Sequence, residues 1–210
     1  TIISSPCPSV VKYIEIYCPE LIKFLVPYHS PMVHTMKMIK ENYKQYKDHK
    51  VAVISPCLSK KKEFIETGFG DYNIGFKSLN DYFIKENINM EHFEKTAFDN
   101  PPAEEAVLFS KPGGLLKTIE GWIPNIGEKT RKVEGPGKIY KYLDQLNKNK
   151  NLENMPYLID CLNCEYGCNS GPLTITQTET IDEIENRISN RRKKDIELYK
   201  NEINIKEILK

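Results

Sequence analysis

The chain has 210 residues, of which 28% are charged and 40% hydrophobic, a balance typical of a globular protein with one sizeable core or two small lobes. Its formal net charge of +1 provides no overall field to recruit nucleic acid or an acidic membrane surface. No apolar run reaches the roughly 18 residues of a membrane span, and no signal peptide is visible. We therefore expect a cytoplasmic protein whose partners include neither nucleic acid nor a membrane.

The first part of the chain alternates helical and strand patterns. Residues 3–8 predict an irregular segment, and Ser9 predicts the start of a helix because its hydroxyl can accept from a free helical N–H. Ser30 followed by Pro31 predicts the start of another helix. Residues 51–54 form a continuous apolar run, which is typical of a strand buried on both faces.

The same alternation continues toward the carboxyl terminus. Residues 72–76 and 156–159 predict short strands, while 122–133 are loop-like and 137–147 form an amphipathic helix. Residues 181–208 predict a long, strongly charged helix. The sequence therefore predicts an α/β fold, with a parallel-type sheet flanked by helices.

Six cysteines are the most informative residues. Cys161, Cys164 and Cys168 are too crowded for three independent disulfides, and in an intracellular protein such a cluster is more often metal-binding or catalytic. Cys18 lies in a helical pattern, which indicates a buried core thiol. The spacing thus favours a metal site over a disulfide framework.

Four of the cysteines are candidate ligands. Cys7 and Cys57 each follow a proline and precede a predicted helix, and Cys164 and Cys168 share a third, glycine-containing loop. Four thiolates from three loops suit a four-iron four-sulfur cluster or a tetrahedral zinc ion. Zinc sites usually use two close pairs, so the spacing favours the cluster. Cys161 remains an alternative to Cys164, because it also forms a Cys-x-x-Cys pair.

Three segments resemble the signature loops of the iron-only (di-iron) hydrogenases. Residues 4–8, Ser-Ser-Pro-Cys-Pro, resemble the family's Thr-Ser-Cys-Cys-Pro. Residues 55–63 resemble its Met-Pro-Cys loop, which ends in Lys-Lys-x-Glu, and residues 164–171 resemble its Cys-Pro-Gly-Gly-Cys loop. Residues 17–31, with Cys-Pro-Glu-Leu and Ser-Pro, and residues 109–119, with Gly-Gly, are similar to further family stretches.

The resemblance implies a hydrogenase large-subunit-like fold with the cluster loops at the carboxyl ends of the strands. It implies an H-cluster, in which a four-iron four-sulfur cluster is held by Cys7, Cys57, Cys164 and Cys168. Cys168 would also bridge to a di-iron subcluster with carbon monoxide, cyanide and dithiolate ligands. Lys60 would donate a hydrogen bond to a cyanide, although without the resemblance it would be one solvated lysine in a run of three.

The chain also departs from the family pattern. Pro6 stands where catalytic members have a proton-relaying cysteine, and proline has no exchangeable proton. Further departures replace a relay serine, two methionines that border the di-iron unit, and a Pro-Gly pair: Val26, Ser55, Leu162 and Glu165-Tyr166. With these changes, the sequence is most similar to the divergent, sensory branch of the family.

The resemblance covers residues 1–173, which we interpret as an H-cluster-type iron–sulfur domain, and residues 174–210 as a C-terminal helical extension. We expect reversible interconversion of hydrogen with protons and electrons, slow or sensory. A non-catalytic iron–sulfur redox-sensing module and a structural zinc domain are the alternatives. The expected partners are upstream hydrogenase and ferredoxin-like domains of a longer parent chain, an electron-carrier protein and the H-cluster maturases.

Overall fold

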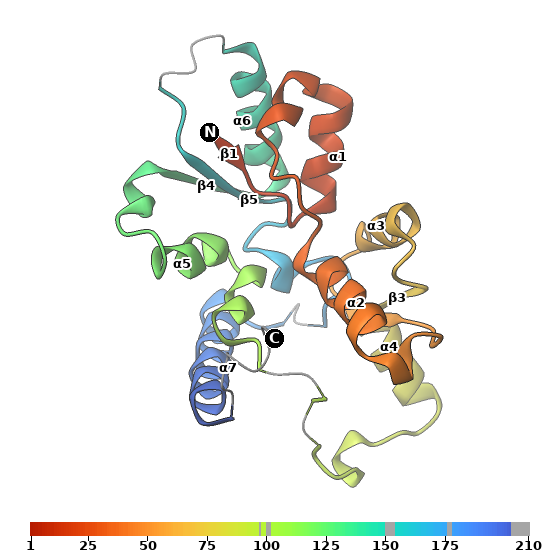
Figure 1. Ribbon diagram of the computed structural model, residues 1–210. Helices are drawn as coiled ribbons and strands as arrows, with labels where there is room; N and C mark the ends of the chain where they lie inside the picture. The colour runs from red at the N-terminus through yellow and green to blue at the C-terminus, as the bar shows by residue number, and fades with distance from the viewer. Residues whose placement is uncertain (97, 100–101, 150–153, 176–177, 203–210) are drawn as a thin grey trace.

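The computed structural model describes residues 1–96, 98–99, 102–149, 154–175 and 178–202 (Figure 1). Its strands form two parallel sheets. The three-stranded sheet has the order β1-β5-β4 and the two-stranded sheet the order β2-β3. The strand bounds are β1 Ile2–Ile3, β2 Ala52–Ser55, β3 Tyr72–Gly75, β4 Thr130–Glu134 and β5 Leu158–Leu162. The expected α/β class, with parallel strands flanked by helices, is confirmed.

Helices connect the parallel strands, and several begin at a proline whose missing N–H costs no helical hydrogen bond. Pro8, Pro31 and Pro136 open α1, α2 and α6 in this way. The α-helices are α1 Pro8–Tyr17, α2 Pro31–Asn42, α3 Lys60–Thr67, α4 Phe76–Lys85, α5 Gly114–Glu120, α6 Pro136–Lys148 and α7 Ile181–Glu202. The described 3-10 helices are η1 Pro19–Phe24, η2 Lys44–Tyr46, η3 Met90–His92, η4 Glu104–Ser110, η5 Ile126–Lys129 and η7 Cys168–Ser170.

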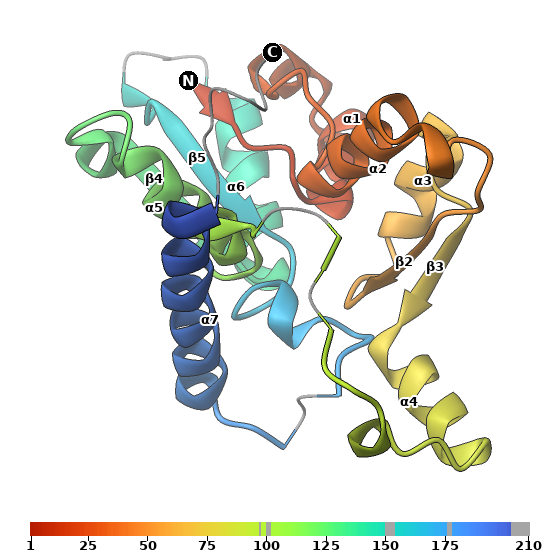
Figure 2. The ribbon, with the colours of Figure 1, turned by 60° about the horizontal axis from the view of Figure 1, so that its bottom comes forward.

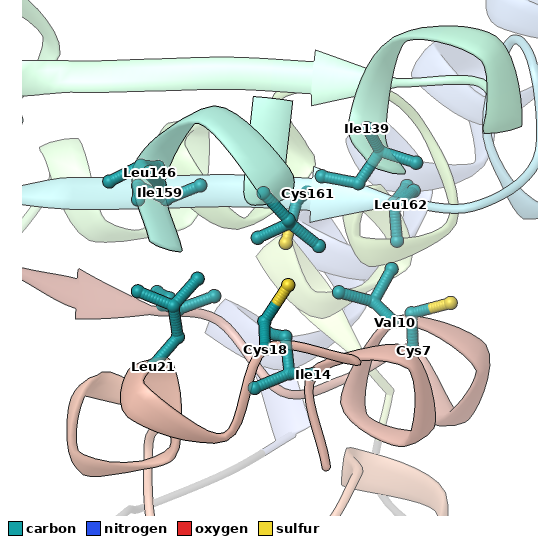
Figure 3. Packing of buried hydrophobic residues seen from close by; sticks show 12 residues of the cluster. Cys7, Val10, Ile14, Cys18, Leu21, Ile139, Leu146, Ile159, Cys161 and Leu162 are labelled. Carbon is teal, nitrogen blue, oxygen red and sulfur yellow. The ribbon is translucent and has the colours of Figure 1, made fainter. Parts of the chain in front are cut away.

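The main core lies between the three-stranded sheet and the helices α1 and α6, which lie side by side (Figure 1). Ile159 and Cys161 point from β5 into this core, where they meet Ile14 of α1 and Ile139 of α6 (Figure 3). On the opposite face of β5, the Asp160 carboxylate accepts a hydrogen bond from an N–H of α5 at 3.1 Å. Because both faces are covered, all five residues of β5 are buried.

The two-stranded sheet has a smaller core of its own. Val33 and Met36 of α2 pack with Phe64 of α3, and Val53 of β2 joins them. The other face of β2 is open, and 49% of Ile54 is exposed. The expectation that this strand is buried on both faces is therefore wrong, because helices cover only one side of a two-stranded sheet.

Two strands lie where the sequence predicts none. β4 falls within the segment 122–133 and the residue after it, and β1 falls within the segment 3–8 and the residue before it. β4 is an edge strand rich in charged residues, so it lacks an apolar run. β1 has only two residues and depends on pairing with β5, a partner distant in sequence.

The helix α7 packs along η4 and is fixed there by two ion pairs. Arg192 pairs with Glu105 through its guanidinium group, and Lys111 Nζ lies 2.7 Å from a carboxylate oxygen of Glu185. The predicted helix over 181–208 is thus present to residue 202, and 203–208 lie outside the described residues. Within the described part of the chain, no helix is both long and apolar enough to cross a membrane.

Gly114 sets the approach of α5 to η4, because a Cβ at this position would lie 1.7 Å from the Leu108 carbonyl oxygen. We expect Gly114→Ala to destabilise the protein by about 1–3 kcal/mol, the usual cost of overpacking. Gly137 in α6 is the matched control, since a Cβ there would meet no atom within 4 Å. Gly137→Ala should be neutral or stabilise by up to about 1 kcal/mol. Urea unfolding of both variants tests this, and equal effects would contradict it.

Candidate metal centre

A cavity of about 300 Å3 lies where the carboxyl ends of strands from the two sheets face each other. The four candidate ligands, Cys7, Cys57, Cys164 and Cys168, all line this cavity. Figure 2 shows the segment after β5, which carries the last two of them, lying between the two sheets. The structure thus brings together four thiols from three loops, at the strand ends where parallel α/β sheets place their ligands.

Cys7 is positioned by the turn between β1 and α1. It has extended backbone angles and forms the N-cap of α1, so its carbonyl oxygen accepts hydrogen bonds from the N–H groups of Val10 and Val11, each at 3.1 Å. The Cys7 sulfur points away from those of Cys18 and Cys161 (Figure 3). The helix start therefore fixes the Cys7 backbone while its side chain faces the cavity.

Cys57 is held by polar side chains of the two-stranded sheet. Its N–H donates to the Ser55 hydroxyl at 3.2 Å, and its carbonyl oxygen accepts from the side-chain amide of Asn73 at 2.7 Å. The Ser55 hydroxyl also lies 2.8 Å from the Asn73 Oδ1 atom. Because Asn73 belongs to the neighbouring strand β3, the Cys57 turn is tied to both strands of its sheet.

The third loop packs so closely against its neighbours that two positions accept only glycine. A Cβ on Gly167, whose φ is +85°, would lie 2.5 Å from the Ser110 carbonyl oxygen. A Cβ on Gly171 would lie 2.5 Å from the Pro56 carbonyl oxygen. Asn169 adds a side-chain hydrogen bond of 2.9 Å to the Ser110 hydroxyl. These contacts fix the third loop between the end of η4 and the second cysteine loop.

The two remaining cysteines lie in the main core, away from the cavity. Cys18 and Cys161 are 0% and 1% exposed, and neither lines the cavity. The Cys161 N–H donates to the Ser4 hydroxyl at 3.1 Å, and its sulfur lies 3.6 Å from the same oxygen. Cys18 is the core thiol that the sequence predicts, and the cavity-facing member of the third loop's first pair is Cys164.

Lys60 is the charged residue of the cavity wall. Its ammonium group donates to the Pro6 carbonyl oxygen at 3.1 Å and to the Glu63 carboxylate at 2.8 Å. Glu63 is itself buried and accepts from both the N–H and the hydroxyl of Ser30, at 2.9 Å each. The sequence predicts that Ser30 caps α2 with its side chain, but the hydroxyl serves this network instead.

Burial dominates the electrostatics of the cavity thiols. It raises the pKa of Cys168 to about 12, and the neighbouring Cys7, Cys164 and Cys57 act in the same direction. Lys60 opposes this rise, because its positive charge favours a thiolate. Burial, followed by Cys7 and Cys57, raises the pKa of Cys164 to about 11. The thiols therefore act on one another as neighbours at a shared site.

The chemistry of the cavity thiols can be compared with the needs of a cluster and of a single ion. Within the described residues, no three histidine, cysteine, aspartate or glutamate side chains lie close enough to hold one metal ion. A zinc ion requires its sulfurs at about 2.3 Å from one point. Four thiols spread around a cavity suit a multi-iron cluster, whose irons each take one cysteine. The residues present therefore fit a four-iron four-sulfur cluster.

Some residues that depart from the family pattern line the cavity, and others do not. Pro6, Ser55 and Leu162 line the cavity, whereas Val26 lines neighbouring pockets. Glu165 is exposed and packs beside Gly135, so it is not part of the cavity wall. The position of Pro6 is thus at the site itself.

The cavity also contains residues that the sequence did not single out. Met32, Phe109 and Asn163 belong to its lining. Met32 follows the Ser-Pro pair, Phe109 begins the Gly-Gly stretch and Asn163 lies inside the Cys-x-x-Cys pair. Each lies beside a recognisable motif, but nothing in the sequence alone shows which neighbours of a motif face inward.

Comparisons with known proteins agree with this geometry. The family described as iron only hydrogenase large subunit, C-terminal domain, matches residues 1–172. Three similar solved structures align with this chain, and each alignment covers 92% of this chain and 65% of the other chain. One is an FeFe-hydrogenase described for oxygen inactivation through its H cluster 2Fe subcluster, at 16% identity and a TM-score of 0.63. Another is a variant of FeFe-hydrogenase HydA1 from Chlamydomonas reinhardtii, at 16% identity and a TM-score of 0.64.

The third is FeFe-hydrogenase HydA(deltaEFG), described for stepwise H-cluster assembly, at 17% identity and a TM-score of 0.62. At these identities the similarity shows the fold alone, and the chain spans 65% of the length of these relatives. No curated protein sequence matches the chain. Because the family match covers 172 of its 210 residues, the chain belongs to the iron-only hydrogenase family, as a C-terminal domain of the large-subunit type.

Proposed function

We propose that the cysteine cavity holds an H-cluster. Cys7, Cys57, Cys164 and Cys168 would bind its four-iron four-sulfur part, and Cys168 would also bridge to a di-iron unit with carbon monoxide, cyanide and dithiolate ligands. The observation that carries this proposal is the convergence of these four thiols on one cavity, in a chain of the hydrogenase family. When bound, such a group supplies electron storage and a metal site for hydrogen.

The chain's own residues contribute binding, charge and exclusion of water. Lys60 is mostly buried and anchored at two acceptors, so its ammonium group can donate a hydrogen bond to a cyanide ligand without losing its position. Leu162, Met32 and Phe109 provide apolar wall. An apolar wall lowers the local dielectric, which strengthens the interaction of Lys60 with a partly negative ligand.

The cavity wall has no titratable group at position 6 that could supply protons. A proton relay needs titratable groups within hydrogen-bond reach or one water apart, and Pro6 offers none at the cavity wall. The exposed Glu165 lies outside the wall. We therefore propose slow reversible hydrogen oxidation and proton reduction, or a sensory role. A non-catalytic iron–sulfur redox-sensing module is the second candidate, and the same Pro6 position favours it.

We also propose a setting for this chain, the reducing cytoplasm of an anaerobic cell. All six cysteines are unpaired, which suits a reducing, anaerobic cytoplasm. One relative is described as inactivated by oxygen through degradation of its H cluster 2Fe subcluster, and we propose a similar sensitivity here. Because the chain spans 65% of the relatives' length, the proposed partners are the rest of a hydrogenase domain with ferredoxin-like domains, an electron carrier and the H-cluster maturases.

The ligand set can be tested by anaerobic reconstitution with iron and sulfide. We expect about four irons and four acid-labile sulfides per chain from the four-iron part alone. Replacing Cys7, Cys57, Cys164 or Cys168 by alanine should each reduce this uptake strongly. Cys18→Ala is the matched control, because Cys18 is a buried thiol that does not line the cavity. Zinc binding without sulfide would contradict the proposal, as would normal uptake by the Cys164 variant.

Hydrogen turnover tests the proton argument. In the complete parent protein loaded by maturases, infrared bands of bound carbon monoxide and cyanide should show the H-cluster. We expect hydrogen evolution with a reduced dye to be about 100- to 10,000-fold slower than in relatives with paired cysteines, the usual cost of a lost acid–base group. Pro6→Cys should raise the rate, because the new thiol supplies a titratable group at the cavity wall. The backbone carbonyl at position 6 can still accept from Lys60, so the lysine should keep its position.

Glu165→Gln serves as the control and should leave the rate unchanged, because the side chain is exposed and outside the cavity wall. Full activity in the unaltered parent that neither substitution changes would mean that protons enter elsewhere. The slow or sensory function would then have to be abandoned.

A further inference from the structure

Three tyrosines form a column between the surface and the main core. Tyr17, at the end of α1, is 64% exposed, and its ring centroid lies 4.9 Å from that of Tyr13, one turn earlier. Tyr13 in turn stacks on Tyr140 of α6, with the ring centroids 4.2 Å apart. Both pairs of rings are in direct aromatic contact, so the three rings form an unbroken path.

The inner end of the column reaches the wall of the cysteine cavity. The Tyr140 hydroxyl donates a hydrogen bond to Oδ1 of Asn163. Asn163 lines the cavity and directly precedes Cys164. Burial raises the pKa of Tyr140, and Cys7 and Cys164 contribute in the same direction. The ring is therefore within electrostatic reach of two of the cavity thiols.

Tyr13 differs from the other two because its phenol donates a hydrogen bond to a carboxylate, which can act as a base. Its hydroxyl donates to Oδ1 of Asp144 at 2.8 Å. This hydrogen bond is the main cause that raises the pKa of Tyr13 to about 12, so the phenol is protonated at neutral pH. Loss of an electron makes a phenol strongly acidic, and a carboxylate within hydrogen-bond reach can then take the proton. The Tyr140 partner is an amide oxygen, which is a much weaker base.

We propose that Tyr140, Tyr13 and Tyr17 carry oxidising equivalents from the cysteine cavity to the surface, with Tyr13 as the redox-active residue. This inference rests on the proposed function, because it assumes an iron–sulfur group in the cavity. The tyrosines would reduce the one-electron oxidants that form when oxygen reacts with such a group. They would act as a protective device in addition to any turnover of hydrogen.

The proposed oxidation balances in electrons and protons. A one-electron oxidant at the cavity takes an electron through Tyr140 from Tyr13 and is reduced. The O–H bond of Tyr13 breaks, its proton moves to Asp144, and a neutral phenoxyl radical remains. A small one-electron donor such as ascorbate then supplies an electron at Tyr17, the proton returns from Asp144, and the phenol is restored.

Packing alone would also place these rings together, so the test must detect a radical. We would oxidise the metal-free chain with photogenerated tris(bipyridine)ruthenium(III), freeze it and record the tyrosyl radical by electron paramagnetic resonance. Tyr13→Phe keeps the ring stack and should remove the part of the tyrosyl signal that the Asp144 carboxylate stabilises, while the other tyrosines still contribute their own. Asp144→Asn should shorten the radical's lifetime by about tenfold, the usual worth of a charge-assisted hydrogen bond.

Two control variants separate this path from nearby alternatives. Tyr82→Phe removes a tyrosine that is 53% exposed and lies outside the column, and it should leave that part of the signal unchanged. Cys18→Ala removes the thiol whose sulfur lies 3.6 Å from the same Asp144 oxygen, and the tyrosyl radical should persist. A signal unaffected by Tyr13→Phe, or one that depends on Cys18, would overturn the proposal.

The protective role needs the cluster-loaded protein. With ascorbate present, oxygen should bleach the visible absorption of the reconstituted cluster several-fold faster in Tyr13→Phe than in Tyr82→Phe. Equal bleaching in protein that holds its cluster would overturn the protective role. Failure of the chain to take up iron and sulfide at all would instead overturn the proposed function, and the protective role with it.

Discussion

The close approach of Gly171 to the Pro56 carbonyl oxygen is the contact on which the cavity depends. The four thiols come from two separate sheets, and among the described residues no strand pairs one sheet with the other. At this point the third loop meets the second with no room for a side chain. The N–H of Leu173 donates to the same Pro56 carbonyl oxygen at 3.1 Å. Backbone contact therefore sets the spacing between Cys57 and Cys168, and a larger residue at Gly171 would force the two loops apart.

The network of Lys60, Glu63 and Ser30 performs the corresponding task for the first loop. An unpaired buried ammonium or carboxylate would cost several kcal/mol, but here the two charges lie 2.8 Å apart and share further polar partners. The acceptor on the first loop is the backbone carbonyl of Pro6, and the donor and carboxylate come from α3. The pair therefore links the loop that carries Cys7 to the helix that follows Cys57, and it brings a positive charge to the cavity wall.

The sequence was sufficient for features that depend on local chemistry and insufficient for those that depend on distant partners. Pro31 and the cysteine loops have local signals, so the start of α2 and the four cavity thiols could be predicted. The predicted cap Ser9 was wrong, because α1 begins at Pro8 with Cys7 as its N-cap. β4 could not be predicted, because a charged edge strand has no apolar run and takes its conformation from pairing with β5. The open face of β2 was missed for a similar reason. An apolar run shows that a strand forms, but not how many helices cover it.

The side chain at position 6 and the arrangement of the four thiols are independent of each other in this structure. Pro6 contributes two different groups to the site: its ring lines the cavity, and its carbonyl oxygen accepts from Lys60. A cysteine at this position would supply the same backbone carbonyl as proline, since every residue carries one, and would add a thiol and a backbone N–H. The exchange therefore removes a titratable group while the anchor of Lys60 stays in place. It leaves the four thiols untouched as well, because they are fixed by a helix N-cap, a Ser55–Asn73 clamp and a glycine contact that do not involve the Pro6 side chain. A cavity built in this way can change the side chain at position 6 and still keep the arrangement of its four thiols.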